Sequence, residues 1–227
     1  IRAFADVDSK ARLEGVKAVI RGREEYKDRL DIQVVAFPQD GVAREPGAKE
    51  LIKDALKKAK VKGRIEMVKV SDDFTLMIDY AHNAMSLESL LTTLKEYHPK
   101  RLVCLFGCGG NRSRDRRFQM GEVSSKLADL TIVTSDNPRF EEPQAIIDDI
   151  KTGIGKTNGK YVEICDRKDA IKYAISHGEV GDVIVLAGKG HEDYQEIKGV
   201  KYPMDERVLI AEVLEELKEE KQQNGKI

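Results

Sequence analysis

The sequence predicts an α/β protein with a three-layer, mostly parallel, doubly wound sheet. Strand-like and helix-like stretches alternate along the whole chain, which is the pattern of repeated βα units. The strand-like stretches are nearly continuous apolar runs, which suits strands that helices cover on both faces. The segments richest in glycine and polar residues come directly after strands, where ligands bind in such folds.

Each predicted element has a local reason in the sequence. The strands are short runs rich in Val, Ile, Leu and Phe, and we expect them at residues 1–7, 31–37, 74–79, 101–107, 130–135, 160–165 and 182–188. The helices have apolar side chains three or four positions apart, and we expect them at residues 10–29, 47–60, 85–97, 114–127, 143–152 and 167–176. Residues 194–204 predict a small hairpin, and a long charged helix is expected from near Asp205.

The composition excludes several classes of protein. Of the 227 residues, 41% are hydrophobic and 35% are charged, and the net charge of −1 gives no field that would attract nucleic acid. No apolar run approaches the roughly 18 residues of a membrane helix and no signal peptide is visible, so no membrane partner is expected. Three cysteines without CxxC spacing favour reduced, mostly buried thiols in a cytoplasmic protein, and four scattered histidines predict no metal site.

Four loops of unusual composition follow predicted strands. They read "DYAHN", "GCGGNRSR", "SDNPR" and "GKGHED", and they end the strands at 74–79, 101–107, 130–135 and 182–188. Because right-handed crossovers place the carboxyl ends of parallel strands on one rim, we expect these loops to lie together. Singly, each loop could be a turn with capping residues; jointly, they predict a ligand site.

The loop "SDNPR" has the chemistry of a site for a zwitterion. Asp136 can accept hydrogen bonds from an ammonium group, and Arg139 offers a planar fork suited to a carboxylate. Asn137 can donate or accept, and Pro138 stiffens the loop. The structural alternative is an Asx-turn in which Arg139 pairs with a glutamate two or three residues further on.

The other three loops could complete such a site. The glycines of "GCGGNRSR" let backbone N–H groups approach a phosphate or carboxylate, and Arg112 follows them. In "GKGHED", Gly188 opens the backbone and Glu192 can hold an ammonium, while the histidine there reads equally well as a capped loop residue. In "DYAHN", Asp79 could accept hydrogen bonds from ribose hydroxyls, and His82 could contact a base or cap the next helix.

From about Val61 to Leu214 the chain resembles the C-terminal domain of the Mur ligases, and among them the ligases that add meso-diaminopimelate. The motifs "KGRIE", "DYAH", "FGCGGNR", "SDNPR" and "AGKGHEDYQ" occur in the family's order and approximate spacing. The resemblance implies that the diaminopimelate pocket is formed by Arg112, Asp136, Asn137, Arg139, Gly188 and Glu192. It also implies that ATP is contacted by Arg64 and Asp79, with His82 nearby. One departure is Ala84, where the family's "DYAHxP" has proline.

The resemblance further implies an ATP-driven, amide-forming reaction. In the family, ATP and magnesium serve to phosphorylate the D-glutamyl carboxylate, and the amine of diaminopimelate then attacks the acyl phosphate. This sequence has no counterpart of the family's ATPase and UDP-binding domains, and it opens at Ile1 inside an apolar run. We therefore expect a fragment without turnover that requires no cofactor, with the ligase domain over residues 61–227.

Residues 1 to about 60 resemble instead two βα units of the cytosine-deaminase-like amidohydrolases. The metal-binding histidines of that family are absent, so deaminase activity is not expected. Two families joined near residues 57–63 predict a chimera, with the N-terminal βα units extending the ligase sheet as one unit. An exposed strand edge at the join would favour a homodimer. The alternative function is a recombined or engineered scaffold without catalytic activity.

Overall fold

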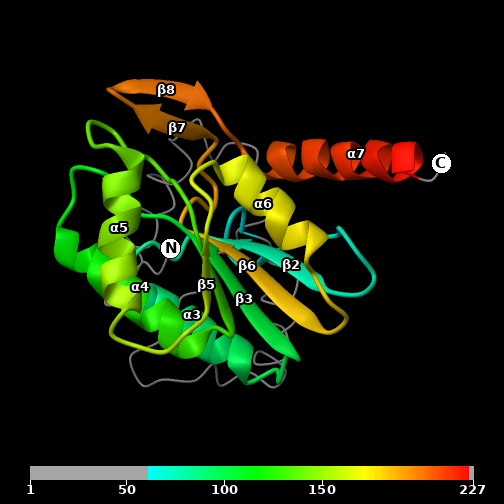
Figure 1. Cartoon of the computed structure of the whole chain (residues 1–227), viewed down its shortest axis with the longest axis horizontal. Helices are drawn as coiled ribbons and strands as arrows, with labels where there is room; N and C mark the ends of the chain where they lie inside the picture. The colour runs from blue at the N-terminus through cyan, green and yellow to red at the C-terminus, as the bar shows by residue number, and fades with distance from the viewer. Residues whose placement is uncertain (1–60, 225–227) are drawn as a thin grey trace, which may run out of the picture. The chain divides into compact units, whose positions relative to one another are not determined.

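The computed structural model describes residues 61–224 of the chain, which Figure 1 draws in colour. The two βα units predicted for residues 1–60 lie outside the described residues. The described part is an α/β domain with a six-stranded sheet and a separate two-stranded hairpin. It has the three-layer, mostly parallel architecture that the sequence predicts.

The six strands of the sheet follow the order β1-β2-β6-β3-β4-β5. They are β1 (Glu66–Val68), β2 (Thr75–Asp79), β3 (Arg101–Phe106), β4 (Leu130–Val133), β5 (Tyr161–Glu163) and β6 (Asp182–Ala187). Neighbouring strands are parallel except for β1, which pairs antiparallel with β2. The last parallel strand of the sequence, β6, therefore lies in the centre, between β2 and β3.

Helices cover both faces of the sheet (Figure 1). They are α3 (Ala84–Lys95), α4 (Arg114–Leu127) and α5 (Pro143–Ile154) on one face and α6 (Arg167–Ser176) and α7 (Glu206–Asn224) on the other. Strand β3 shows how one strand serves both layers, because Leu102, Cys104 and Phe106 join the first core and Val103 and Leu105 join the second. Burial on both faces explains the continuous apolar runs in the sequence.

The strands and helices predicted between residues 74 and 205 are all present, with slightly shifted ends. Strand β1 was not predicted, because three residues beside charged neighbours give no apolar run. The strand at the other edge of the sheet, β5, is equally short. Short edge strands offer few free backbone groups to a second chain, and the homodimer stays a prediction.

The predicted hairpin is formed by β7 (Tyr194–Ile197) and β8 (Val200–Pro203). Arg139, in the loop after β4, extends this hairpin as an isolated bridge. Its N–H donates to the carbonyl oxygen of Glu196 at 2.9 Å, and its carbonyl oxygen accepts from the N–H of Lys198 at 2.7 Å. The hairpin is thereby attached to the loop that the sequence singled out. Within residues 61–224, no helix combines the length and the apolarity needed to cross a membrane.

Helices α4 and α5 cross closely through two glycines. A Cβ atom on Gly153 would lie 1.9 Å from the carbonyl oxygen of Phe118, and one on Gly121 would lie 2.2 Å from the carbonyl oxygen of Ile150. These distances leave no room for a side chain, so the crossing requires glycine at both positions. The contact holds α5, and the loop that precedes it, firmly against α4.

Candidate functional site

The four polar loops meet at the carboxyl edge of the sheet, as predicted. They follow β2, β6, β3 and β4, which are consecutive strands in the sheet. Backbone hydrogen bonds join loops that are distant in the sequence. The N–H of Gly188 donates to the carbonyl oxygen of Asp79 at 3.0 Å, and the N–H of Gly110 donates to that of Asn137 at 2.8 Å. The strand order is therefore what brings their side chains together.

Lys189 lies at the centre of these loops and is fully buried. Its Nζ donates to Oδ1 of Asn137 at 2.9 Å, to Oε2 of Glu192 at 3.1 Å and to the carbonyl oxygen of Tyr194. An ammonium group has three N–H donors, so these bonds use all of them. The buried charge is thus satisfied by partners from two loops and from the start of β7.

Asp136 is buried beside this lysine and keeps one oxygen atom without a donor. Its Oδ1 lies 3.3 Å from Nζ of Lys189, close enough for attraction between the charges, yet no described residue donates a hydrogen bond to it. The two observations agree, because the three donors of the lysine point to other acceptors. A buried carboxylate oxygen without a donor is rare in folded proteins and is more often found at functional sites than in a packed core.

Asn137 connects these charged groups and is only 4% exposed. Its Oδ1 accepts from Nζ of Lys189 and from the N–H of Glu196, each at 2.9 Å, and its Nδ2 donates to Oε2 of Glu192 at 2.9 Å. Two donors facing Oδ1 fix the orientation of the amide.

Arg139 lies at the rim of the site, in the left-handed backbone region with φ of 53°. Its Nε donates to Oε2 of Glu196 at 3.1 Å, and Nη1 donates to the carbonyl oxygen of Gly110 at 2.8 Å. The guanidinium has five N–H donors, so three of them carry no hydrogen bond to a described residue. The structural alternative, an ion pair with a glutamate two or three residues further on, is wrong, because the carboxylate partner belongs to β7.

Arg112 and Gly188 belong to two of the loops that surround the loop after β4. Arg112 is exposed, and the residue before it, Asn111, accepts through Oδ1 from the N–H of Phe140 at 3.1 Å, which joins its loop to the loop of Arg139. Gly188 has φ of 107°, and a Cβ atom there would lie 3.7 Å from Oδ2 of Asp136. Both predicted residues therefore lie next to the loop after β4.

Glu192 binds an ammonium group of the protein itself, that of Lys189, and its predicted contact with a ligand stays a prediction. Burial raises the pKa of its carboxyl. The hydrogen bond from Asn137 and the positive charge of Lys189 lower the pKa by more than burial raises it, so the net shift is downward. Its second oxygen, Oε1, accepts from the phenol of Tyr80 at 3.4 Å. Glu192 thus links the amino-acid loops to a second cluster around Tyr80.

Two of the three residues expected to contact ATP border this tyrosine. The guanidinium carbon of Arg64 lies 4.8 Å from the centre of the Tyr80 ring, and the ring centre of His82 lies 4.6 Å from it. His191 lies on Tyr80 as well, at 4.8 Å between ring centres. The alternative role of His82 as a helix cap is wrong, because Asn83 caps α3 through a side-chain bond to the N–H of Ser86.

Asp79, the third residue expected at ATP, is buried behind this cluster. Its Oδ2 accepts from the N–H of Ile65 at 2.9 Å, and its Oδ1 accepts from the N–H of Ala81 at 2.8 Å. Both oxygens therefore hold backbone in place, so that Asp79 fixes the segments that carry Arg64 and His82.

Comparison with known proteins identifies the family. The family model described as "Mur ligase, glutamate ligase domain" matches residues 63–190, a range that contains nearly the whole of the four loops. This chain belongs to the Mur ligase family.

Individual Mur ligases match over a longer range. The UDP-N-acetylmuramoyl-L-alanyl-D-glutamate–2,6-diaminopimelate ligase of Caldanaerobacter subterraneus is 48% identical over 165 residues, which are 73% of this chain and 34% of that ligase. The ligase of the same name from Clostridium tetani is 39% identical over 214 residues, 93% of this chain and 42% of that ligase. A solved structure of a ligase of this name has a TM-score of 0.65 at 38% identity, over 74% of this chain and 34% of the other. The chain therefore spans less than half the length of these Mur ligases.

The Clostridium tetani alignment also bears on residues 1–60. It covers 93% of the chain, more than residues 61–227 alone could provide, so it runs into this segment. The alignment with the Caldanaerobacter subterraneus ligase, in contrast, covers only 73% of the chain. The predicted amidohydrolase origin of residues 1–60, and with it the chimera, stays a prediction without support from these matches.

Reasoning from the sequence missed two residues of this Mur ligase site, Lys189 and Tyr80. A lysine between two glycines reads as a solvated residue, and its importance becomes visible only through its burial. Arg117, on α4, also has a role that the sequence does not show. It is buried and pairs with Glu141 and Asp149, which holds α4 against the loop after β4.

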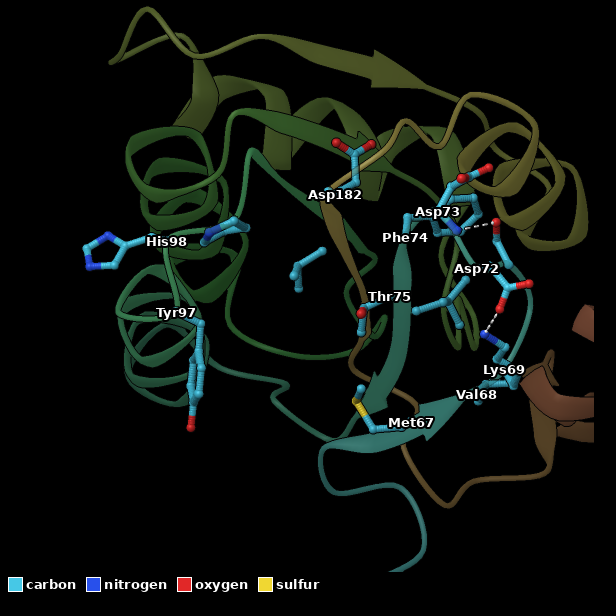
Figure 2. A pocket seen from close by; sticks show the side chains of 15 residues that line it. Met67, Val68, Lys69, Asp72, Asp73, Phe74, Thr75, Tyr97, His98 and Asp182 are labelled. Atoms are coloured by element: carbon cyan, nitrogen blue, oxygen red, sulfur yellow. Dashed lines mark hydrogen bonds and ion pairs between the residues drawn. The ribbon is translucent and has the colours of Figure 1, made fainter.

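A hollow of about 550 Å³ lies at the opposite edge of the sheet (Figure 2). It is lined by the amino ends of β2 and β6 and by the loop before β3. In Figure 2, Tyr97 and His98 border one side, and Lys69 and Asp72 pair on the other. None of the residues that line it comes from the four polar loops, so we place the functional site at the carboxyl edge and not in this hollow.

Proposed function

We propose that this chain binds meso-diaminopimelate and supplies the amino-acid-binding domain of a diaminopimelate-adding Mur ligase. The observation that carries the proposal is that one loop holds both a carboxylate with an oxygen that lacks a donor, that of Asp136, and a guanidinium with unused N–H donors, that of Arg139. The free end of diaminopimelate carries an ammonium and a carboxylate, so it matches both groups. The name that the most similar relatives carry agrees with this substrate.

Each group of the site then has a role. The remaining N–H donors of Arg139 bind the carboxylate as a fork, and the carboxylate of Asp136 accepts from the ammonium. Arg112 reaches the same carboxylate from the glycine-rich loop, and Gly188 lets the backbone pass close to the ligand. Asn137 and Glu192 hold the site in shape without contacting the ligand, because their polar atoms already bind other groups of the protein.

The cluster around Tyr80 fits a nucleotide beside the amino-acid site. Arg64 and His82 are exposed there, so a cation and an aromatic ring are open to a phosphate and a base. In the complete ligase, ATP with magnesium would activate the D-glutamyl carboxylate for attack by the diaminopimelate amine. We propose that the remaining domains are needed for this step and that the chain alone gives no turnover.

The proposal is tested by titrating the full chain with meso-diaminopimelate in a calorimeter. We expect saturable binding and at least about tenfold weaker binding to Arg139→Ala, since hydrogen bonds to charged groups contribute about 1.5–3 kcal/mol each. L-Lysine lacks the second carboxylate and should lose affinity to a similar extent.

A matched arginine serves as the control. Arg114 is 70% exposed and pairs with Asp149 on α5, so Arg114→Ala should leave the affinity unchanged. Equal affinity for meso-diaminopimelate in the Arg139→Ala variant would contradict the proposal. No heat at millimolar ligand would favour the alternative, a scaffold without a surviving site.

A further inference from the structure

Lys189 is the most completely buried charge among the loops of the proposed site. Its side chain is 0% exposed, and it is surrounded by Asn137, Glu192, Tyr194 and Asp136. Burying an ammonium group is costly unless each of its donors finds an acceptor. A chain that only needed packing at this position could hold a methionine instead, so the buried charge calls for an explanation.

The first effect of the ammonium is on the amide of Asn137. Both groups that face Oδ1 are donors, namely Nζ of Lys189 and the N–H of Glu196. The amide nitrogen must then point the other way, where it donates to Oε2 of Glu192 at 2.9 Å. Without the lysine, only the N–H of Glu196 would fix this orientation of the amide. The carboxylate of Glu192 would lose its bond from Lys189, and its bond from Asn137 would no longer be held in place.

The second effect is on the charges. Asp136 and Glu192 carry two negative charges and Lys189 carries one positive charge, so these three residues need one further cation to be neutral. Without the lysine the two carboxylates would repel each other, and the pKa of Glu192 would rise because the cation that lowers it is gone. A protonated carboxyl could no longer receive the ammonium of a ligand as a charged partner.

The third effect is on the direction of hydrogen bonds. All three donors of Lys189 point to atoms other than Oδ1 of Asp136, although this oxygen lies 3.3 Å away. The lysine therefore attracts the carboxylate of Asp136 without occupying its hydrogen-bonding capacity. The carboxylate of Asp136 therefore keeps an oxygen atom that receives no hydrogen bond from a described residue.

From these contacts we infer that Lys189 is a positioning residue for the amino group of the ligand. Its ammonium holds Asn137 and Glu192 in place and leaves the carboxylate of Asp136 without a hydrogen bond from the lysine, so that this carboxylate can accept from an incoming ammonium. The inference rests on the proposed function, because the ligand in question is the diaminopimelate discussed above.

Two measurements on the full chain test this role. One is the affinity for meso-diaminopimelate, and the other is the pKa of the Glu192 carboxyl, followed by NMR without ligand. In Lys189→Met we expect about 100-fold weaker binding, because Asn137 and Glu192 each lose a hydrogen-bond donor and Asp136 loses its neighbouring cation. We also expect the pKa of Glu192 to rise above its ordinary value of 4.5, because the nearby cation is gone.

The control is Lys172→Met, which removes a lysine that pairs with Glu216 and Glu220 on α7, away from the site. It should change neither measurement. A chemical rescue separates charge from packing: n-propylammonium replaces the atoms removed in Lys189→Ala and should restore at least about tenfold in affinity, whereas n-propanol should not.

The outcomes are distinct. Wild-type affinity in Lys189→Met, or an unchanged pKa of Glu192, would overturn the inference. If the unsubstituted chain does not bind diaminopimelate, the proposed function fails, but the pKa of Glu192 still decides whether Lys189 organises the site. If Lys189→Met does not fold, Lys189→Arg takes its place. A flat guanidinium cannot direct three donors at the same atoms, so we expect about tenfold weaker binding, and wild-type affinity would again overturn the role.

Discussion

The carboxylate of Glu192 faces an amide, an ammonium and a phenol, and all three favour its charged form. Burial raises the pKa of this carboxyl, but the hydrogen bond from Asn137 and the charge of Lys189 bring it below its ordinary value of 4.5. A carboxyl with a lowered pKa in the folded state stabilises the fold above the pKa that it has in the unfolded chain. This contribution is lost as the pH falls through the lowered pKa.

Glu192→Gln should therefore lower the free energy of unfolding at neutral pH and make its decline below about pH 5 shallower. Urea unfolding at a series of pH values measures both effects. Glu215→Gln, on the exposed side of α7, is the control. Its free energy of unfolding should fall with pH below about pH 5 as steeply as that of the unsubstituted chain. If the free energy of unfolding falls equally steeply with pH in Glu192→Gln and in the unsubstituted chain, this carboxyl has the same pKa in the folded and the unfolded chain.

At the level of residues, the sequence was informative wherever a loop follows a strand. Asp136, Asn137, Gly188 and Glu192 could be assigned to one site because parallel strands end on one rim. The partners of these residues could not be predicted. Lys189 binds Asn137 of the loop after β4 and the carbonyl oxygen of Tyr194 at the start of β7, and no pattern of neighbours along the chain shows such contacts.

Among the elements, the crossing of α4 and α5 reverses the usual effect of glycine in a helix. Replacing a helical glycine by alanine normally stabilises a helix by about 1 kcal/mol. Gly153→Ala should instead destabilise the protein by about 1–3 kcal/mol, because the new methyl group meets the carbonyl oxygen of Phe118 and forces the helices apart. Denaturant unfolding measures the change.

Gly155→Ala is the matched control, two residues further along. A Cβ atom on Gly155 would lie 3.5 Å from the carbonyl oxygen of Lys151, an ordinary contact, so its effect should stay within about 0.5 kcal/mol. If Gly153→Ala were as stable as Gly155→Ala, the close crossing would not exist in solution.

The sequence predicts elements best where burial is greatest. Strands β3 and β6 are covered on both faces, and their apolar runs place them almost to the residue. Strand β1 has three residues of mixed exposure, and its pairing with β2 depends on backbone contacts made by a segment without periodicity. The strand order also lies beyond the sequence, since nothing in the composition of β6 says that it inserts between β2 and β3.

For the molecule as a whole, Arg167 joins parts that are far apart in the sequence. It is buried at the start of α6 and donates to Oε1 of Glu206 on α7, to the carbonyl oxygen of Ser135 and to that of Ala187. Removing one partner of such a pair leaves a buried charge uncompensated. Burial raises the pKa of Glu206, against the effect of the Arg167 charge.

Arg167→Met should therefore lower the free energy of unfolding by about 3–5 kcal/mol. The loss should be larger at pH 8 than at pH 5, because an acid whose pKa is higher in the folded state destabilises the fold as the pH rises. Lys168→Met removes the next residue, a partly exposed lysine paired with Glu212 and Glu216, and should cost less than about 1 kcal/mol. Equal losses in the two variants would contradict the role of Arg167.

The bridge between the hairpin and Arg139 couples ligand binding to the docking of the β7–β8 hairpin. The backbone of this arginine forms an isolated bridge with Ile197 of β7, while its side chain borders the space proposed for the ligand. Any molecule that immobilises the guanidinium also favours the docked hairpin. Thermodynamic reciprocity then requires that whatever steadies the hairpin strengthens binding by the same factor.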